Sequence, residues 1–147
     1  MNQESSESLS GGCLCGGVRY RIDGECRDIV CCHCENCRRT HGHFAAYTAV
    51  HESQLTLLAA DSLRWYHDES PDTQRGFCNR CGASLFWKPH ADADSISVSA
   101  GSLDQGGGLK VVGHIFLSEA GSYYRVDDGL PGFDHGSGGA FDRPQGG

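Results

Sequence analysis

The chain alternates between apolar and polar residues in several short stretches, and this period of two is typical of half-buried β-strands. The pattern is clearest at residues 96–100, where Ile96, Val98 and Ala100 share one face and serines occupy the other. Residues 18–22 repeat it with arginines on the polar face. Further strands are predicted at residues 44–50, 55–58, 63–67, 84–88 and 110–117. We expect the last of these to pair with residues 96–100.

Helical periodicity is weak by comparison. One short helix is predicted at residues 35–40, ended by Gly42. The chain has 147 residues, of which 21 are glycine, and this fits one domain with many turns. We therefore predict a mainly β fold, a single domain of small antiparallel sheets with one short helix. Residues 1–10 are predicted to be a disordered N-terminus, residues 11–135 the domain, and residues 136–147 a glycine-rich flexible tail.

The formal net charge of −7 bears on the choice of partner. Seven zinc-bound thiolates and two zinc ions would bring the net charge to about −10. We therefore expect no nucleic-acid partner and no anionic lipid surface. Residues 1–10 lack the basic region and apolar core of a secretory signal, and no apolar run is long enough to span a bilayer. We expect no membrane partner and a cytoplasmic location. The sequence leaves the oligomeric state open.

Seven of the nine cysteines fall into three tight clusters, and this count separates two kinds of metal site. The clusters are Cys13-Leu-Cys15, Cys32-His-Cys-Glu-Asn-Cys37 and Cys78-Asn-Arg-Cys81. Four thiolates close a tetrahedral zinc, whereas three leave a second zinc one ligand short. We therefore predict two zinc ions per chain, one for the fold and one for the chemistry. A disulfide framework is the alternative, but an odd count and C-x-C spacing suit it poorly.

Cys13, Cys15, Cys78 and Cys81 are predicted to form the closed, structural zinc site. The two pairs lie far apart in the chain, so the metal would staple the start of the domain to its middle. Glycines beside both pairs allow tight turns that direct amide N–H groups at sulfur. A redox-active C-x-x-C is the alternative interpretation, but the βαβ context that it needs is missing.

Cys32, Cys34 and Cys37 are predicted to hold the second zinc at the start of the short helix, whose dipole favours thiolate. Three thiolates reduce the Lewis acidity of zinc, so a soft substrate thiol suits the open position better than water. The alternative is a fourth ligand from this chain, which would make the site an inert structural knuckle. The candidates for that ligand are Cys26, Cys31, His33, His41 and His43.

Side chains that follow the last cysteine of this cluster are candidates for the chemistry. Arg38, with Arg39, would offset thiolate charge or bind a substrate carboxylate. His41 is a candidate proton shuttle for forming or breaking a hemithioacetal, as is His43. In the alternative interpretation the arginines are solvated surface charges and the histidines are ordinary loop residues.

Four segments in one order carry a resemblance to a known family. They are Gly12-Cys-Leu-Cys-Gly-Gly-Val-Arg19, Cys32-His-Cys-Glu-Asn-Cys-Arg-Arg39, Phe77-Cys-Asn-Arg-Cys-Gly82 and Leu130-Pro-Gly-Phe133. Together they resemble the glutathione-dependent formaldehyde-activating enzyme (GFA) family, which includes the domain of centromere protein V. The resemblance runs from about residue 10 to residue 133. Cys26, Cys31 and the glycine-rich tail are not part of the motif.

The resemblance implies a fold of small antiparallel sheets, called a β-tent, stapled by zinc. It implies the same division of the seven cysteines into a structural zinc and a second zinc. It also implies addition of glutathione to formaldehyde, which gives S-hydroxymethylglutathione. Candidate glutathione contacts are Arg38, Arg39, His114 and residues 123–125.

These observations predict a zinc-dependent carbon–sulfur lyase that acts on a thiol/aldehyde adduct through a zinc-bound thiolate. Its partners would be a small thiol such as glutathione and an aldehyde such as formaldehyde. One alternative is a non-catalytic binding module in which both zincs are structural. A third interpretation is a thiol-based redox or metal sensor that uses Cys26 and Cys31. The sequence does not identify the thiol or the aldehyde.

Overall fold

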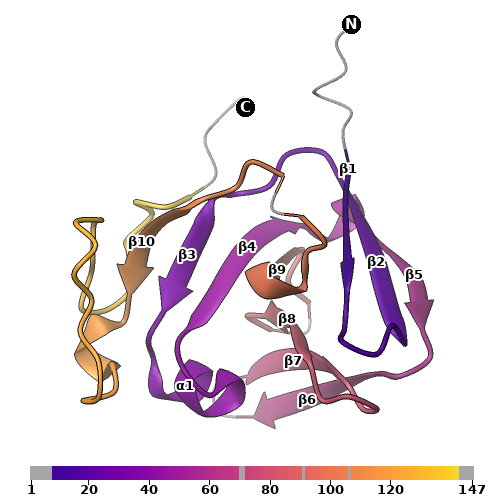
Figure 1. The fold of residues 1–147 in the computed structure, drawn as a ribbon, viewed down its shortest axis with the longest axis horizontal. Coiled ribbons are helices and arrows are strands. Elements are labelled where there is room, and N and C mark those ends of the chain that lie inside the picture. The colour runs from indigo at the N-terminus through magenta and orange to yellow at the C-terminus, as the bar shows by residue number, and fades with distance from the viewer. Residues whose placement is uncertain (1–7, 70–71, 91, 106, 143–147) are drawn as a thin grey trace, which may run out of the picture.

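The computed structural model describes residues 8–69, 72–90, 92–105 and 107–142. This part of the chain is mainly β, as predicted, and its strands form two sheets (Figure 1). The larger sheet has seven strands in the order β10-β3-β4-β9-β8-β7-β6, and the smaller has three in the order β1-β2-β5. Among the described residues, no helix is both long enough and apolar enough to cross a membrane.

The elements have the following bounds. The smaller sheet contains β1 (Ser8–Gly12), β2 (Val18–Asp23) and β5 (Leu55–Ala60). The larger sheet contains β3 (Ile29–Cys32), β4 (Ala45–His51), β6 (Leu63–Glu69), β7 (Asp72–Cys78), β8 (Ser84–Lys88), β9 (Ser95–Ser99) and β10 (Val111–Ile115). The helical elements are α1 (Glu35–His41) and the 3-10 turns η2 (Glu52–Gln54), η3 (Ala100–Ser102) and η4 (Leu117–Glu119).

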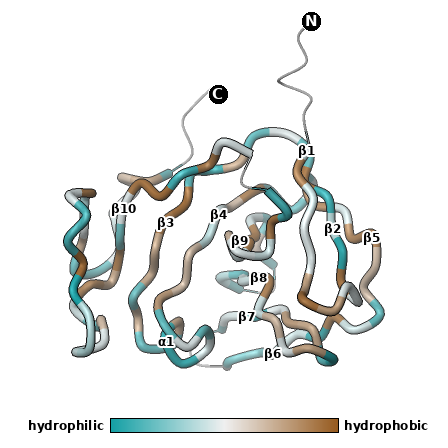
Figure 2. Tube along the Cα trace, in the orientation of Figure 1, coloured by the Kyte–Doolittle hydropathy of each residue, from teal (hydrophilic) through white to brown (hydrophobic). Residues whose placement is uncertain are grey.

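Helix α1 confirms the predicted short helix, and it is capped at both ends. The Cys34 sulfur accepts a hydrogen bond from the N–H of Cys37 at 3.3 Å and so serves as the N-cap. At the other end, Gly42 takes a left-handed conformation with φ 82° and its N–H donates to the Arg38 carbonyl. Figure 2 shows that the helix is hydrophilic along most of its length, which fits its position at the edge of the fold.

The main core lies between the two sheets, where the predicted alternation turns apolar side chains inward. Val18, Tyr20 and Ile22 of β2 are fully buried. They meet Phe86 of β8 and Val98 of β9, and the rings of Tyr20 and Phe86 pack edge to face at 5.4 Å. The core therefore joins the two sheets and holds the loops at their ends in fixed positions.

One predicted pairing is wrong. Strand β10 pairs in parallel with β3, not with β9. Both edges of β9 are already occupied by β4 and β8, so the chain that follows β9 crosses to the free edge of β3. A parallel pairing needs such a crossover, and here it places the segment after β10 beside α1 (Figure 1).

The ends of the domain differ from the predicted boundaries. Strand β1 begins at Ser8, inside the segment predicted to be disordered, and residues 1–7 lie outside the described part of the chain. In the predicted flexible tail, the ring of Phe141 packs against Phe133 with centroids 5.5 Å apart. Residues 143–147 also lie outside the described part.

Candidate active site and metal centres

The first cysteine cluster has the geometry of a closed four-sulfur site. The sulfurs of Cys13, Cys15, Cys78 and Cys81 all lie within 4.8 Å of one another. Two of the pairs, Cys13–Cys15 and Cys15–Cys78, are 3.7 Å apart. A tetrahedron with zinc–sulfur bonds of about 2.3 Å has an edge of about 3.8 Å, whereas a disulfide would bring sulfurs to about 2.05 Å. The four residues therefore fit a tetrahedral metal and are not disulfide-bonded.

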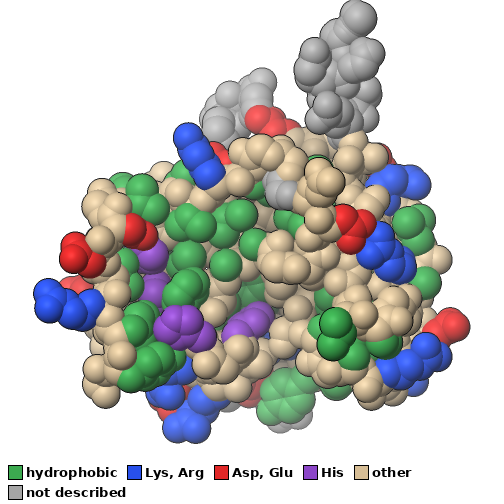
Figure 3. Space-filling model, in the orientation of Figure 1, with side chains coloured by type: hydrophobic (Ala, Val, Ile, Leu, Met, Phe, Trp, Pro, Cys, Tyr) green, Lys and Arg blue, Asp and Glu red, His purple; other side chains and the backbone are tan. Residues whose placement is uncertain are grey.

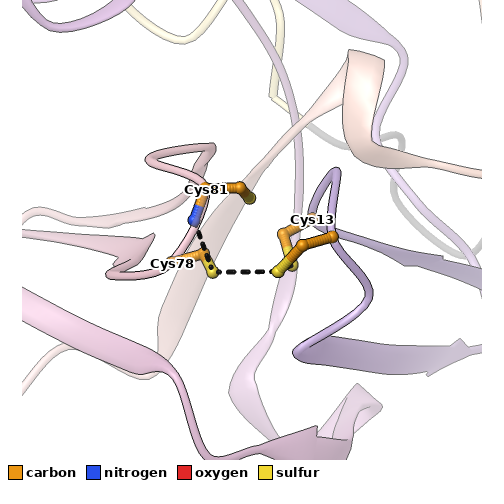
Figure 4. A group of neighbouring side chains, drawn as sticks. Cys13, Cys78 and Cys81 are labelled. Atoms are coloured by element: carbon orange, nitrogen blue, oxygen red, sulfur yellow. Dashed lines mark hydrogen bonds between the residues drawn. The ribbon is translucent and has the colours of Figure 1, made fainter.

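Two facing hairpin turns supply these sulfurs. Figure 4 shows Cys78 and Cys81 on the turn after β7, with Cys13 directed at them from the turn between β1 and β2. Gly82, with φ 80°, lets the second turn close, and its N–H donates to the carbonyl of Cys78 at 2.8 Å. The spacing of each cysteine pair thus follows from a hairpin turn, and the core between the sheets brings the two turns together.

Polar hydrogens around this cluster disperse its negative charge. The N–H of Val18 donates to the Cys13 sulfur at 3.2 Å, and those of Arg80 and Cys81 donate to the Cys78 sulfur. The Ser62 hydroxyl lies 3.2 Å from the Cys78 sulfur and, with these amides, lowers the pKa of Cys78 to about 5. A thiolate is therefore the favoured form of this ligand.

The second cluster brings three cysteines together, without a fourth potential ligand in the described part of the chain. Cys32 ends β3, Cys34 caps α1 and Cys37 lies in its first turn, and their sulfurs all lie within 4.8 Å of one another. Contact with the Cys32 thiol lowers the pKa of Cys34, and the same contact raises that of Cys32. No other cysteine, histidine or carboxylate among the described residues joins this group. The cluster fits a metal with one position left for another ligand.

The residues considered for that fourth position have other environments. Cys31 is buried, and this burial raises the pKa of its thiol to about 11. Cys26 packs against the main core instead. Each of the three histidines directs a ring nitrogen at a tyrosine hydroxyl, namely His33 to Tyr124 (2.5 Å), His41 to Tyr47 (2.8 Å) and His43 to Tyr123 (2.6 Å).

A cavity of about 490 Å³ lies over the three cysteines. Its walls include Tyr47 of β4, Arg75 of β7 and Trp87 of β8, and the segment after β10 adds Phe116. This volume is within the range of small-ligand sites. Phe116 has φ 58°, the left-handed region that a bulky residue rarely adopts, and it is the one non-glycine residue with positive φ among those described. Backbone strain therefore coincides with a wall of the cavity.

None of the three side chains predicted to take part in catalysis, His41, Arg38 and Arg39, lines this cavity. His41 does not line it, but its ring nitrogen contacts the Tyr47 hydroxyl, which belongs to the cavity wall. Arg38 is half-buried and is not among the lining residues, and its charge acts on Tyr124. Arg39 is exposed and pairs with Glu35 at 3.0 Å. The arginines that do line the cavity are Arg27 and Arg75, and sequence reasoning missed both.

A chain of hydrogen-bonded polar side chains runs from the buried His33 to the exposed Asp128. The ring of His33 is fully buried, and its two nitrogens contact Tyr124 and His114. The other ring nitrogen of His114 contacts the Asp128 carboxylate at 2.7 Å. His114 and Tyr124, considered above as glutathione contacts, thus use these polar atoms within the chain.

A larger hollow of about 730 Å³ lies beside the C-terminal end of α1, whereas the N-terminal end of the helix lines the cavity over the cysteines. His41 and Phe44 line it on one side, and Cys13 and Leu103 line it on the other. Figure 3 shows histidine and hydrophobic side chains gathered on this face of the molecule over β3, β4 and α1. His41 therefore lies between this hollow and the cavity over the cysteines.

Comparison with known proteins defines the family. The sequence model described as glutathione-dependent formaldehyde-activating enzyme (GFA) matches residues 8–119, so the chain belongs to the GFA family. It is 28% identical over 78 residues to a protein of Schizosaccharomyces pombe named an uncharacterized lyase. That match covers 52% of this chain and 55% of the yeast protein, so the chain spans little more than half of this curated relative.

A solved structure supports the fold alone. It is a crystal structure of a Rhodobacter sphaeroides protein that was a structural-genomics target. Its TM-score is 0.56 at 21% sequence identity, and the match covers 69% of this chain and 97% of that chain. The family match and this likeness of fold agree on a GFA domain, and its two cysteine clusters could hold metal.

Proposed function

We propose that this protein is a zinc-dependent carbon–sulfur lyase acting on a thiol/aldehyde adduct of the S-hydroxymethylglutathione type. The observation that carries the proposal is the three-cysteine cluster under a cavity, with no fourth ligand among the described residues. A closed structural site would need that ligand. The family description, which names glutathione and formaldehyde, supports the choice of substrates.

Zinc suits both clusters because their candidate ligands are cysteine sulfurs, which lie within 4.8 Å of one another in each cluster. Cys13, Cys15, Cys78 and Cys81 would hold the structural ion, and Cys32, Cys34 and Cys37 the second. At the second position the ion would supply a Lewis-acidic centre that favours the ionised form of an incoming thiol. Each of the other contributions comes from side chains around the cavity.

Tyr47 and His41 are the proposed route for the hydroxyl proton of the adduct. Burial, followed by the charge of Arg75, lowers the pKa of His41 to about 4, so its ring is neutral near pH 7. A neutral ring can accept a hydrogen bond from the Tyr47 hydroxyl, 2.8 Å away. In the lyase direction the adduct hydroxyl would give its proton to this pair. The carbon–sulfur bond then breaks, the carbonyl forms, and the electron pair stays on sulfur.

The apolar walls of the cavity would shield this reaction from water. Trp87 and Phe116 line the cavity beside the cysteines, and Ile115 joins them from the end of β10. Exclusion of water strengthens electrostatic effects at the sulfur and protects the aldehyde from hydration. Arg38 would act only at longer range through its charge, because it is not among the residues that line the cavity.

Exchange spectroscopy tests the activity directly. The adduct also forms without a catalyst, so the measured quantity is the rate of exchange between glutathione, labelled formaldehyde and the adduct by NMR. We expect the zinc-loaded protein to accelerate exchange, and the Cys34→Ser variant to lose this acceleration while keeping its fold. If the zinc-loaded protein leaves the exchange rate unchanged, glutathione and formaldehyde are not its substrates.

The binding-module alternative requires a different second site. Both zincs would be structural, and the second would need a ligand that the described residues do not supply. The sensor alternative would use Cys26 and Cys31, but Cys31 is buried and the pKa of its thiol is raised, so this residue is poorly suited to react. Both observations favour the lyase.

A further inference from the structure

We propose that Arg75 is the charge partner of the Cys32/Cys34/Cys37 centre, and that it selects a thiolate over a neutral ligand in the open position. The inference rests on the proposed function, because it concerns the ligand of the same site. Arg75 would act on that ligand through charge, as a specificity-determining residue.

The guanidinium of Arg75 is partly buried without a carboxylate partner. Its Nη1 atom is shielded from solvent and has no hydrogen-bond partner among the described residues. None of the ion pairs found between described residues includes Arg75. An unpaired charge removed from water is costly, so a partner anion is expected nearby.

The two glutamates that line the same cavity are engaged elsewhere. Glu119 accepts a hydrogen bond from the backbone N–H of Glu35 at 2.9 Å, and the Glu35 carboxylate pairs with Arg39. The second cavity arginine, Arg27, donates to the backbone carbonyl of Tyr47 at 2.9 Å. The carboxylates of the cavity therefore leave the charge of Arg75 unbalanced.

The groups that face Arg75 identify the partner as the cysteine cluster. Its positive charge acts on Cys34 and Cys37 of the N-terminal part of α1, on His41 at the end of α1, and on Tyr47 of β4. Its side chain also contacts the Tyr47 hydroxyl. Of these groups, the two cysteines are the ones that become anionic when they hold a metal.

The two cysteine clusters balance their charge in different ways. Around the first, backbone amides of Val18, Arg80 and Cys81 and the Ser62 hydroxyl direct hydrogens at sulfur. Around the second, the backbone N–H of Cys34 is directed at the Cys32 sulfur and that of Cys37 at the Cys34 sulfur. Here a full cation, Arg75, is added to these partial charges.

The positive charge of Arg75 affects whether the open position binds an anionic or a neutral ligand. Three thiolates and a divalent ion carry one net negative charge, which Arg75 neutralises. A thiolate in the fourth position adds a second negative charge, whereas water or another neutral ligand adds none. In a cavity shielded from solvent, a cation in the same wall as the cysteines favours the anionic ligand by roughly tenfold to a hundredfold.

A cobalt-substituted protein can test this selectivity without measuring activity. Glutathione and the neutral ligand imidazole would each be titrated into protein with both sites loaded, while the visible cobalt absorption is followed. We expect Arg75→Met to weaken glutathione binding by about tenfold to a hundredfold and to change imidazole binding by less than about threefold. Arg75→Lys keeps the charge, so it should retain most of the affinity for glutathione.

Arg39→Met is the matched control, because it removes a positive charge from the neighbouring helix. The side chain of Arg39 is 70% exposed, so its charge is screened and glutathione binding should change by less than about threefold. If Arg75→Met does not load both sites, Arg75→Gln provides a second neutral variant that retains hydrogen-bond donors.

The outcomes separate the two proposals. If the wild-type cobalt spectrum does not respond to glutathione, the proposed function fails and this inference fails with it. If the wild-type protein responds and Arg75→Met binds glutathione equally well, the inference alone is wrong. Equal losses for glutathione and imidazole would also overturn it, because they would show a packing defect instead of a charge effect.

Discussion

The buried ring of His33 contacts the ring of His114 through a 2.9 Å hydrogen bond between Nε2 and Nδ1. The Asp128 carboxylate can only accept a hydrogen bond, so Nε2 of His114 donates to it, and in a neutral ring Nδ1 of His114 then accepts. With both rings neutral, Nε2 of His33 carries a hydrogen, and Nδ1 of His33 accepts from the Tyr124 hydroxyl. These contacts then fix both tautomers.

His114→Leu should destabilise the protein because it removes this partner of a buried N–H. The imidazole of His33 has no exposed surface, so its lost hydrogen bond cannot be replaced by bulk water. We expect the free energy of unfolding to fall by about 2–3 kcal/mol in urea denaturation of the metal-loaded protein. Metal affinity should fall more at the second cluster than at the first, because His33 lies between Cys32 and Cys34.

Asp128→Asn is the matched control for that variant, since its amide oxygen can still accept from His114. We expect it to cost about 1 kcal/mol or less. Equal unfolding midpoints for His114→Leu and the wild-type protein would show that the buried pair contributes nothing to stability.

Serine substitutions at Cys78 and Cys34 should separate the structural site from the open one. Cys78 is fully buried and joins the two hairpin turns, so Cys78→Ser should lower the free energy of unfolding by several kcal/mol, on the order of 5. Cys34→Ser should lower it far less and abolish thiol exchange. Circular dichroism during urea unfolding, together with metal content per chain, measures both effects. Two variants that unfold alike would contradict the division of the cysteines.

The neutral state of His41 predicts how stability depends on pH. Burial lowers its pKa from 6.5 to about 4, so between these values the unfolded chain binds more protons than the folded one. The contribution of this residue to stability is therefore complete above about pH 6.5. It declines as the pH falls and is lost below about pH 4, a change of about 2 kcal/mol once solvent screening of the half-buried ring is allowed for.

His41→Gln should flatten this part of the stability profile. The measurement is the urea midpoint of the metal-loaded protein at several pH values from 4 to 7. His90→Gln serves as the comparison, because His90 is exposed and its loss should leave the slope unchanged. A His41→Gln profile parallel to that of the wild-type protein would mean that His41 does not titrate in this way.

The strained backbone of Phe116 predicts an inverted order of stability between glycine and alanine. At φ 58° a β-carbon costs about 1 kcal/mol, so Phe116→Gly should be at least as stable as Phe116→Ala. At the neighbouring Ile115, inside β10, alanine should be the more stable of the two. Urea denaturation of the four variants gives the comparison, and the ordinary order at residue 116 would show that no strain is stored there.

Local signals in the sequence predicted much of the fold. Apolar residues two apart indicated the strands that became β2 and β9, and Gly42 indicated the end of α1. These signals work because the residues that produce them lie within one strand or one turn. Strand β7 was missed because polar residues and Gly76 interrupt its apolar pattern, and Arg75 was missed with it.

The division of the cysteines was also accessible from the sequence, since C-x-C and C-x-x-C spacings restrict which sulfurs can meet. The structure brings the predicted sets together, although the sequence alone left a fourth ligand from Cys31 or the histidines open. Burial and hydrogen bonding direct those side chains away, and neither follows from spacing.

The sequence by itself therefore determined the mainly β character, the short helix and the two sets of cysteines that could hold metal. Each depends on residues close together in the chain, or on the limited number of thiolates that one metal can bind. Tertiary structure alone decided that β10 lies beside β3, that Asp128 reaches His114, and that Arg75 faces the open cluster. These contacts depend on which sheet edges remain free and which charges become buried, and both are properties of the whole packed chain.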